Sequence, residues 1–300
     1  MKIKTKTADR VFYCFNALLM TFIVVVMLYP FLNMLAVSLN NATDSVRGGI
    51  YLWPRVPTLR NYETIFKDPN LFSAFRNSVL RTVICTVLGI FVCSMAGYIL
   101  SRTEFVFNKI LTIYFLLTMY VSAGLIPTYF LYRDLGLVGN FHVYWIPGLF
   151  GAFNVIVIRT FIQGLPESLV EAARIDGAGE FRTFIQIVLP ICKPVLATVG
   201  LWIAVGNWND WFTTFIYASS KPNLFTLQYT LMSYLASSLQ TSSNSFSQYL
   251  QEQGPGGFTA TTPIAVRATI TIVASVPILC VYPFLQKYFV KGVHVGSVKG

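Results

Sequence analysis

The 300 residues are 55% hydrophobic and only 11% charged, and 22 lysines and arginines against 12 acidic residues leave a net charge of +10. Soluble domains carry about 25% charged residues, so this composition excludes an ordinary soluble enzyme and indicates a membrane protein. The cations gather at the ends of apolar stretches, as the positive-inside rule expects, which argues against a nucleic-acid-binding surface. The five cysteines show no C-x-x-C pair, which argues against a disulfide framework or a metal site.

Six apolar segments are long enough to cross a bilayer, which takes about 20 largely apolar residues. They cover about residues 11–38, 73–100, 108–131, 141–163, 194–217 and 265–288. We therefore predict an all-α integral membrane protein with six transmembrane helices, forming a single domain over residues 1–300. An even number of spans puts both termini on one side, and the basic N-terminal flank predicts that this side is the cytoplasm.

Two arginines, Arg76 and Arg81, stand at the beginning of the second predicted span. A long cationic side chain near the end of a membrane helix usually extends along the apolar surface until its charge reaches water. We therefore expect both arginines to reach the outer surface of the membrane. Pairing of either charge with a neighbouring subunit is the alternative.

A charged stretch, EAARIDGAGEFRTFIQIVLP at Glu171–Pro190, lies in the predicted cytoplasmic loop of about residues 165–193. Pro166 is placed for the first turn of a helix, and Gly177 suits the left-handed residue that ends one. Pro190 and Pro194 together predict the end of a second helix before the next apolar segment starts. Apolar residues recur at helical spacing on one face of that helix, namely Phe181, Phe184, Ile185 and Val188. The loop is therefore predicted to be a helix-turn-helix.

This stretch resembles the EAA loop of the permease subunits of binding-protein-dependent ABC importers. The matching residues are Glu171-Ala172-Ala173, Asp176-Gly177-Ala178 and Ile187–Pro190. In that family the loop is the coupling helix that docks on the ATPase subunit. The resemblance implies an ATPase-docking site at Glu171, Ala172, Ala173, Asp176, Gly177, Ala178, Gly179 and Phe181. The alternative is an ordinary cytoplasmic hairpin that only joins two spans.

A polar and aromatic run, WIAVGNWNDW at Trp202–Trp211, lies in the fifth predicted span. Counted from Pro194, Asp210 stands about 7–8 Å outward of the middle of this helix, a depth at which a carboxylate is costly and usually functional. Amides, a carboxylate and flat rings suit a sugar, so we predict a substrate pathway at Trp202, Asn207, Trp208, Asn209, Asp210 and Trp211. We expect Asn207 and Asp210 to share one helix face. The alternative is an aromatic belt with interhelical hydrogen bonds.

The outer loop of about residues 218–264 is unusually long. Its first half, Leu224–Leu239, is predicted to form a helix on the surface, and its Ser- and Gln-rich second half a flexible stretch. The first outer loop, at Gly49–Pro54 and Leu59–Tyr62, is similar to the same region of carbohydrate-importing permeases. The closing residues Tyr282–Gly292 and Gly296–Gly300 resemble the tail of the oligosaccharide and polysaccharide branch of these permeases. In such an importer the long loop would face the binding protein.

The resemblance implies a permease subunit that imports an oligosaccharide or a polysaccharide-derived sugar across the cytoplasmic membrane of a bacterium. The partners it implies are a second homologous permease, an ABC ATPase dimer, an extracytoplasmic solute-binding protein, the sugar and membrane lipid, with no nucleic acid. An amino acid, a peptide or an anion is the alternative cargo of such an importer. An ATP-independent carrier or a membrane-embedded enzyme is the alternative from another class.

Motifs of nucleotide-binding and hydrolytic sites are absent from the sequence. It contains no G-x-x-x-x-G-K-[ST], no H-E-x-x-H and no G-x-S-x-G. We therefore expect a protein that is not an enzyme and binds no cofactor, with ATP and magnesium held by the partner ATPase.

Overall fold

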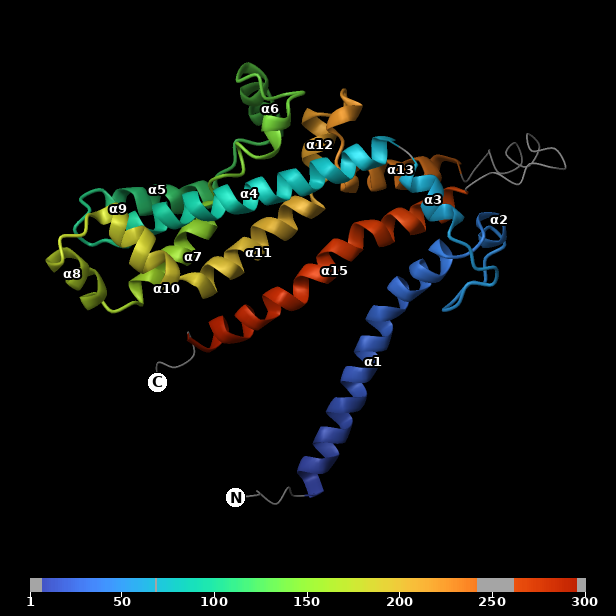
Figure 1. Ribbon diagram of the computed structural model, residues 1–300, viewed down its shortest axis with the longest axis horizontal. Helices are drawn as coiled ribbons and strands as arrows, with labels where there is room; N and C mark the ends of the chain where they lie inside the picture. Colours follow the sequence, from blue (N-terminus) through green and yellow to red (C-terminus); the bar gives the residue numbers. More distant parts are fainter. Residues whose placement is uncertain (1–6, 68, 242–261, 296–300) are drawn as a thin grey trace. The chain divides into compact units, whose positions relative to one another are not determined.

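The computed structural model describes residues 7–67, 69–241 and 262–295, and the regular elements of these residues are helices (Figure 1). Apart from them, an isolated antiparallel bridge joins Asn40 and Pro57. The predicted all-α class is therefore confirmed for the part of the chain that is described. The basic residues before Thr7, residues 242–261 of the long outer loop and the closing residues 296–300 lie outside it.

The chain divides into two units, which are described one at a time. The first consists of the described parts of Met1–Asp68 and Ser233–Val276. Its helices are α1 (Thr7–Ser38), α2 (Ala42–Ser45), α3 (Arg60–Phe66), the larger part of α13 (Leu227–Thr241) and the first part of α15 (Pro263–Val295).

The second unit consists of the described parts of Pro69–Met232 and Pro277–Gly300. Both predicted functional regions lie in it. Its elements are α4 (Pro69–Ser101), α5 (Asn108–Tyr120), α6 (Leu125–Asp134), η1 (Phe141–Tyr144), α7 (Ala152–Gln163), α8 (Ser168–Ile175), α9 (Glu180–Thr183), η2 (Phe184–Val188), α10 (Leu189–Ile191), α11 (Lys193–Asn209), α12 (Phe212–Tyr217) and η3 (Pro222–Leu224). Of these, η1 and η3 are 3₁₀ turns and η2 is a π-helical turn.

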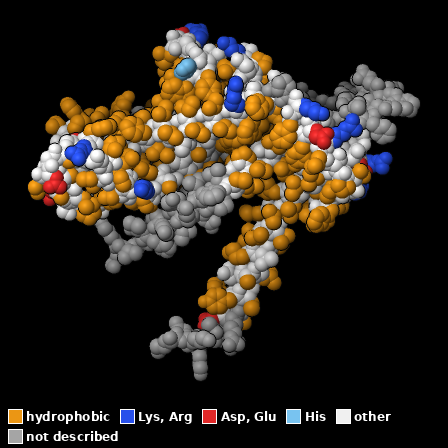
Figure 2. Space-filling model, viewed as in Figure 1, with side chains coloured by type: hydrophobic (Ala, Val, Ile, Leu, Met, Phe, Trp, Pro, Cys, Tyr) orange, Lys and Arg blue, Asp and Glu red, His pale blue; other side chains and the backbone are white. Residues whose placement is uncertain are grey.

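Glycines let α4 pack closely against α7 and α11. A β-carbon at Gly97 on α4 would lie 3.1 Å from the backbone nitrogen of Arg159 on α7, and one at Gly200 on α11 would lie 2.6 Å from Cδ1 of Ile90. The side chains buried between these helices include Cys85, Val155, Ile158, Val199 and Ile203. Figure 2 shows that apolar side chains also cover much of the visible surface of this unit, as is typical of a protein that meets lipid.

Two helices are long and apolar enough to cross a membrane on their own, Val11–Ser38 and Asn70–Ser101. Two bent pairs qualify only if each pair counts as one span: Asn108–Tyr120 with Leu125–Asp134, bent by 115°, and Glu180–Ile191 with Lys193–Asn209, bent by 83°. By length and composition, the described residues therefore hold two to four candidate spans. The first two predicted spans are each a single helix.

The third and fifth predicted spans are wrong as continuous helices. The third is interrupted after Tyr120, and Gly124 takes φ 84°, a positive value that favours glycine. Pro127 then lies in the first turn of α6, where its missing N–H is tolerated. The fifth is interrupted at Asp210, which has an extended ψ of 106°. The apolar sequence pattern continues across both breaks, because hydropathy depends on residue type and not on backbone conformation. The pattern therefore did not predict the breaks.

The fourth predicted span also differs from a continuous helix. It begins with the short turn η1, and its helical part, α7, has 12 residues. The sixth, 265–288, lies inside the single helix α15. In the long outer loop, the helix predicted at Leu224–Leu239 is present as α13 at Leu227–Thr241.

Candidate functional site

The predicted hairpin is present, and its turn has the geometry that a glycine gives to a helix end. After α8, Gly177 N donates to Arg174 O at 3.0 Å and Ala178 N donates to Ala173 O at 2.9 Å. Gly177 has φ 77°. These two hydrogen bonds and the positive φ form the Schellman pattern that closes a helix. The prediction that Gly177 takes a left-handed conformation is confirmed.

The second helix of the hairpin is irregular. It passes from α9 through the π turn η2, in which Leu189 N bonds to Phe184 O, and then into α10. The helix ends at Ile191, between Pro190 and Pro194, as predicted, although the chain continues in helical form for one residue past Pro190. Pro190 lies inside α10 directly after the wide turn, and the chain bends by 83° between Ile191 and Lys193. A proline has no N–H for the α-helical hydrogen bond, so a widened turn beside it is physically reasonable.

One side of the hairpin is exposed, and we call it the docking face: Glu171, Ala172, Ile175 and Phe181. Ile175 is 86% exposed and Phe181 is 64% exposed. Ala173 is only 4% exposed, because it lies on the face of α8 that packs against its own unit. Its side chain therefore does not face outward as the predicted docking role requires. The other predicted docking residues form the turn: Asp176, Gly177, Ala178 and Gly179.

Arg174 ties the hairpin to the loop that follows α4. Its guanidinium donates to the two carboxylate oxygens of Glu104 at 2.7 and 2.5 Å, and to Oε1 of Glu180 at 2.9 and 3.2 Å. Tyr98 Oη on α4 donates to Oε2 of Glu180 at 2.6 Å. The hydrogen bonds from Arg174 lower the pKa of Glu104, and those to Glu104 and Glu180 raise the pKa of Arg174. We call these four side chains the hairpin clamp.

Sequence reasoning missed the hairpin clamp. Its members come from α4, the following loop and both arms of the hairpin, so no short motif contains them. The sequence offered one signal for the clamp. Charged residues are rare in this chain, and three of them, Glu104, Arg174 and Glu180, lie within or beside the predicted cytoplasmic loops.

A second polar cluster lies where α11 ends. Arg81 on α4 is 3% exposed, so the prediction that it reaches the outer surface is wrong. Its Nη1 donates to the carbonyl oxygen of Asp210 at 2.9 Å, its Nη2 donates to the Asp210 carboxylate, and its Nε donates to Asn207 Oδ1 at 3.3 Å. The guanidinium also lies 5.0 Å from the ring centroid of Tyr144. A buried cation needs such partners.

The Asp210 carboxylate is engaged within the chain. Besides Arg81, it accepts hydrogen bonds from the backbone nitrogen of Thr213 at 3.1 Å and from its hydroxyl at 2.5 Å. These bonds cap the start of α12. The prediction that Asn207 and Asp210 share one helix face is wrong, because α11 ends at Asn209 between them. Arg81 brings the two side chains together instead.

The other residues of the predicted pathway fall into different environments. Trp208 is buried and meets the ring of Phe75 edge to face at 6.2 Å. Trp202 is 41% exposed, with its ring 5.6 Å from that of Phe153. Asn209 is exposed, and Asn207 and Trp211 are half-buried. The side chains open to a ligand are therefore those of Trp202 and Asn209, with Trp211 in part, because the amide of Asn207 is bonded to Arg81 and donates to the carbonyl oxygen of Ile203 at 2.9 Å.

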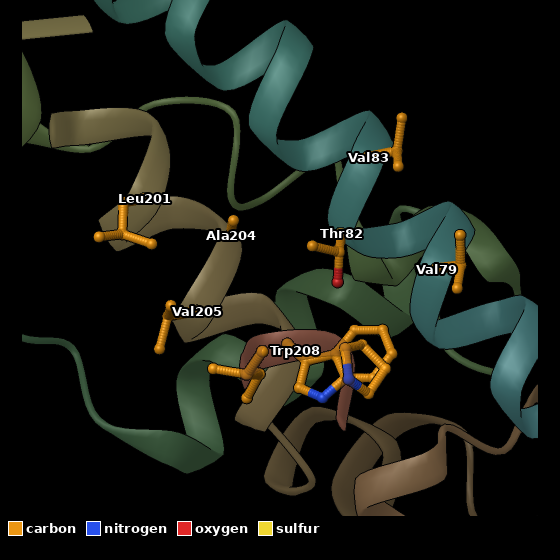
Figure 3. A pocket seen from close by; sticks show the side chains of 9 residues that line it. Val79, Thr82, Val83, Leu201, Ala204, Val205 and Trp208 are labelled. Atoms are coloured by element: carbon orange, nitrogen blue, oxygen red, sulfur yellow. The ribbon is translucent and has the colours of Figure 1, made fainter. Parts of the chain in front are cut away.

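A cavity of about 350 Å³ lies beside Trp208 (Figure 3). Its walls are Val79, Thr82, Val83, Leu201, Ala204, Val205, Trp208, Pro277 and Ile278. The Thr82 hydroxyl has no hydrogen-bond partner in the described chain, and the other walls are apolar or aromatic. A sugar needs several converging polar groups, so this cavity does not suit one.

Comparison with known proteins gives concordant matches over most of the chain. Residues 94–295 match the family described as the binding-protein-dependent transport system inner membrane component. Protein LplC of Bacillus subtilis is 33% identical over 98% of this chain and 96% of its own length. The polygalacturonan/rhamnogalacturonan transport system permease protein YtcP of the same organism is 32% identical over 99% and 100%.

A solved structure agrees in fold. It is a chain of a bacterial ABC transporter involved in the import of the acidic polysaccharide alginate, with a TM-score of 0.84 and 27% identity over 96% of this chain and 100% of that one. The helical arrangement described above is therefore shared with a transporter subunit along almost the whole chain.

Proposed function

Because this chain belongs to the family of inner membrane components of binding-protein-dependent transport systems, we propose that it is the permease subunit through which an ABC importer carries an oligosaccharide or polysaccharide fragment into the cell. The polysaccharides for which YtcP and the alginate importer are named support a sugar cargo. The observation that carries the proposal is the exposed hairpin, whose docking face presents Ile175 and Phe181 to a partner.

We propose that residues 1–300 act as one transmembrane domain with six spans, both termini in the cytoplasm and the loop of about 165–193 on the same side. Two long apolar helices support this arrangement, and in it each bent pair forms one broken span and the shorter apolar helices Ala152–Gln163 and Ile264–Cys280 belong to the remaining two. In this topology the hairpin faces the cytoplasm, where an ATPase is available.

The proposed partners follow from the subunit's role. An ABC ATPase dimer would bind the docking face and hold ATP and magnesium, so that this chain needs no cofactor of its own. A second, homologous permease would complete the pathway, an extracytoplasmic solute-binding protein would deliver the sugar, and membrane lipid would cover the apolar surface. No nucleic acid takes part. Closure of the ATPases would move the hairpin as a rigid body and switch the bundle between outward- and inward-open states.

We propose that the pathway is lined by Trp202, Asn209 and Trp211, whereas Asn207 acts indirectly, because its amide already binds Arg81 and the carbonyl oxygen of Ile203. Rings and amides of this kind stack on sugar rings and bond their hydroxyls. Asp210 acts indirectly, because its carboxylate already binds Arg81 and Thr213. The buried Trp208 supports the end of α11 rather than the solute.

Reconstitution into proteoliposomes tests the proposal. The complex of both permeases and the ATPase is supplied with the binding protein, and uptake of labelled glycans, amino acids and peptides is measured. We expect uptake of an oligosaccharide that requires both ATP and the binding protein. Uptake of an amino acid or a peptide, without uptake of any glycan, would show that the cargo is not a sugar. Uptake without the ATPase would contradict the assignment to an ABC importer.

A further inference from the structure

The loop between α2 and α3 carries three consecutive large side chains that are all exposed, namely Tyr51, Leu52 and Trp53. Trp53 is the most exposed of them, at 83%. We call these three residues the aromatic tip. An exposed apolar run of this kind marks a surface that meets another molecule, and the hydrogen bonds of the loop indicate which one.

The loop turns back beside α1 instead of continuing away from it. On α1, Nδ2 of Asn33 donates to the carbonyl oxygen of Ile50 at 2.7 Å and to that of Tyr51 at 3.0 Å. Asn33 stands five positions by subtraction before Ser38, the last residue of the helix, or about 7.5 Å along the axis. The aromatic tip therefore begins alongside the last turns of α1.

The depth of Asn33 in a bilayer follows from the length of the span. The candidate span Val11–Ser38 has 28 residues, or about 42 Å of helix, whereas the hydrocarbon core of a bilayer is about 30 Å thick. A centred span therefore extends about 6 Å beyond the hydrocarbon at each end. Asn33, about 7.5 Å from the Ser38 end, lies where the hydrocarbon changes to headgroups. Tryptophan and tyrosine gather at this boundary.

The remainder of the loop becomes charged as it reaches the end of α1. The backbone nitrogen of Val56 donates at 2.8 Å to Oδ1 of Asn40, which follows the helix. One residue earlier, Nε of Arg55 donates to the Asp44 carboxylate at 3.0 Å. The loop thus begins its aromatic tip beside the span and sets its ion pair beyond the helix end. That order matches the change from hydrocarbon to water across a headgroup layer, whereas a protein that docks from the water imposes no such order.

We propose that the aromatic tip inserts into the headgroup layer of the bilayer and anchors the Ser38 end of α1 there. Tyrosine and tryptophan suit this role, because each joins an apolar ring to a polar group. The partner is lipid in general, since the tip carries no charge that would select one headgroup. The proposal requires only that the chain spans a membrane, whatever solute it carries, so its failure would leave the proposed cargo untouched.

Spin labelling of the complete transporter in phospholipid vesicles tests the proposal. In a complex whose exposed cysteines are replaced, which in this chain are Cys14 and Cys280, W53C carries a nitroxide. Its relaxation by oxygen, which concentrates in the bilayer, is compared with its relaxation by a water-soluble nickel chelate. We expect oxygen to relax the label at position 53 more strongly than the nickel chelate does.

The matched control is R47C in the same loop. Arg47 is exposed and precedes Gly48, whose carbonyl oxygen accepts a hydrogen bond from Arg55 at 2.6 Å, so it lies on the charged side of the loop. At this position the order of the two reagents should be reversed, with the nickel chelate relaxing the label more strongly than oxygen.

Two results overturn the proposal. One is stronger relaxation by the nickel chelate at position 53 as well as at position 47, which would place the tip in water. The other is weak relaxation by both reagents at position 53, which would mean that the second permease or the solute-binding protein covers the tip. If W53C does not assemble, the fluorescence that W53F removes from the unaltered complex replaces the label. Quenching of that fluorescence by lipids brominated near the headgroup supports insertion, and a lack of quenching overturns it.

Discussion

Arg81 on α4 binds both the carboxylate and the backbone carbonyl of Asp210, at the residue where α11 stops being a helix. Two residues 129 positions apart in the chain are thereby joined. The carbonyl that Arg81 contacts lies at a helix end, where backbone acceptors lack helical partners. The guanidinium therefore balances a half-buried charge and also satisfies the backbone at the break.

Removing one partner of this ion pair should destabilise the protein. R81Q leaves the Asp210 carboxylate without its counter-charge, and because that side chain is 28% exposed the cost falls below the about 3–5 kcal/mol of a fully buried pair. We expect a clearly lower melting temperature for the purified complex and reduced uptake. R76Q is the matched control, because Arg76 is an exposed arginine of the same helix. A melting temperature equal to that of the control would show that the pair does not hold the break.

A branched residue at the hairpin turn should uncouple transport from ATP hydrolysis. Gly177 has φ 77° and an added β-carbon would meet no neighbour, so the penalty of G177V is conformational, at least about 1 kcal/mol. We expect a higher ratio of ATP hydrolysed to sugar imported. G179A is the control, since Gly179 has φ −70° and equally open surroundings. Similar ratios of ATP hydrolysed to sugar imported in the two variants would show that the conformation of this turn plays no part in coupling.

Cysteine cross-linking should distinguish the two faces of α8. In a background without the native cysteines, I175C is expected to cross-link to the ATPase in membranes, because Ile175 is 86% exposed. A173C should not, because Ala173 is 4% exposed. Immunoblotting of the cross-linked subunits provides the measurement. Cross-linking of A173C alone would mean that the opposite face of α8 binds the ATPase.

Acid should weaken the hairpin clamp. Hydrogen bonds from Arg174 lower the pKa of Glu104 from its ordinary value of 4.5. A lowered pKa stabilises the folded state above the ordinary value, and this contribution is lost as the pH falls through the lowered one. We expect E104Q to melt below the unaltered protein at pH 7 and the difference to shrink below about pH 4.5. E171Q, on the exposed face of α8, is the control. A difference that does not change with pH would exclude the ionised carboxylate as the cause.

Local sequence signals predicted the local features well. The Asp-Gly turn at Gly177 and the two long apolar helices needed only neighbouring residues, since a helix end and a hydropathy run are both properties of a short stretch. The exposed side of the hairpin was less predictable. Ala172 and Ala173 are the same residue type, and only the packing of α8 on its own unit decides that one is exposed and the other buried.

Features that depend on distant residues escaped prediction. The break at Asp210 lies inside a continuous apolar pattern, and its role became visible only with Arg81 beside it. The same holds for Tyr98 and Glu180, which are 82 positions apart and meet in the hairpin clamp. Pairing of this kind is set by how α4 packs against its neighbours, which periodicity along one segment does not encode.

The helix α4 carries Arg81 toward one end and Tyr98 toward the other, 17 positions apart by subtraction, or about 26 Å along a helix axis. A single stiff helix thus bears contacts of both the hairpin and the break at Asp210. Damage at either extremity should then give one shared defect, so a genetic screen for futile ATP consumption would return substitutions from both ends of α4.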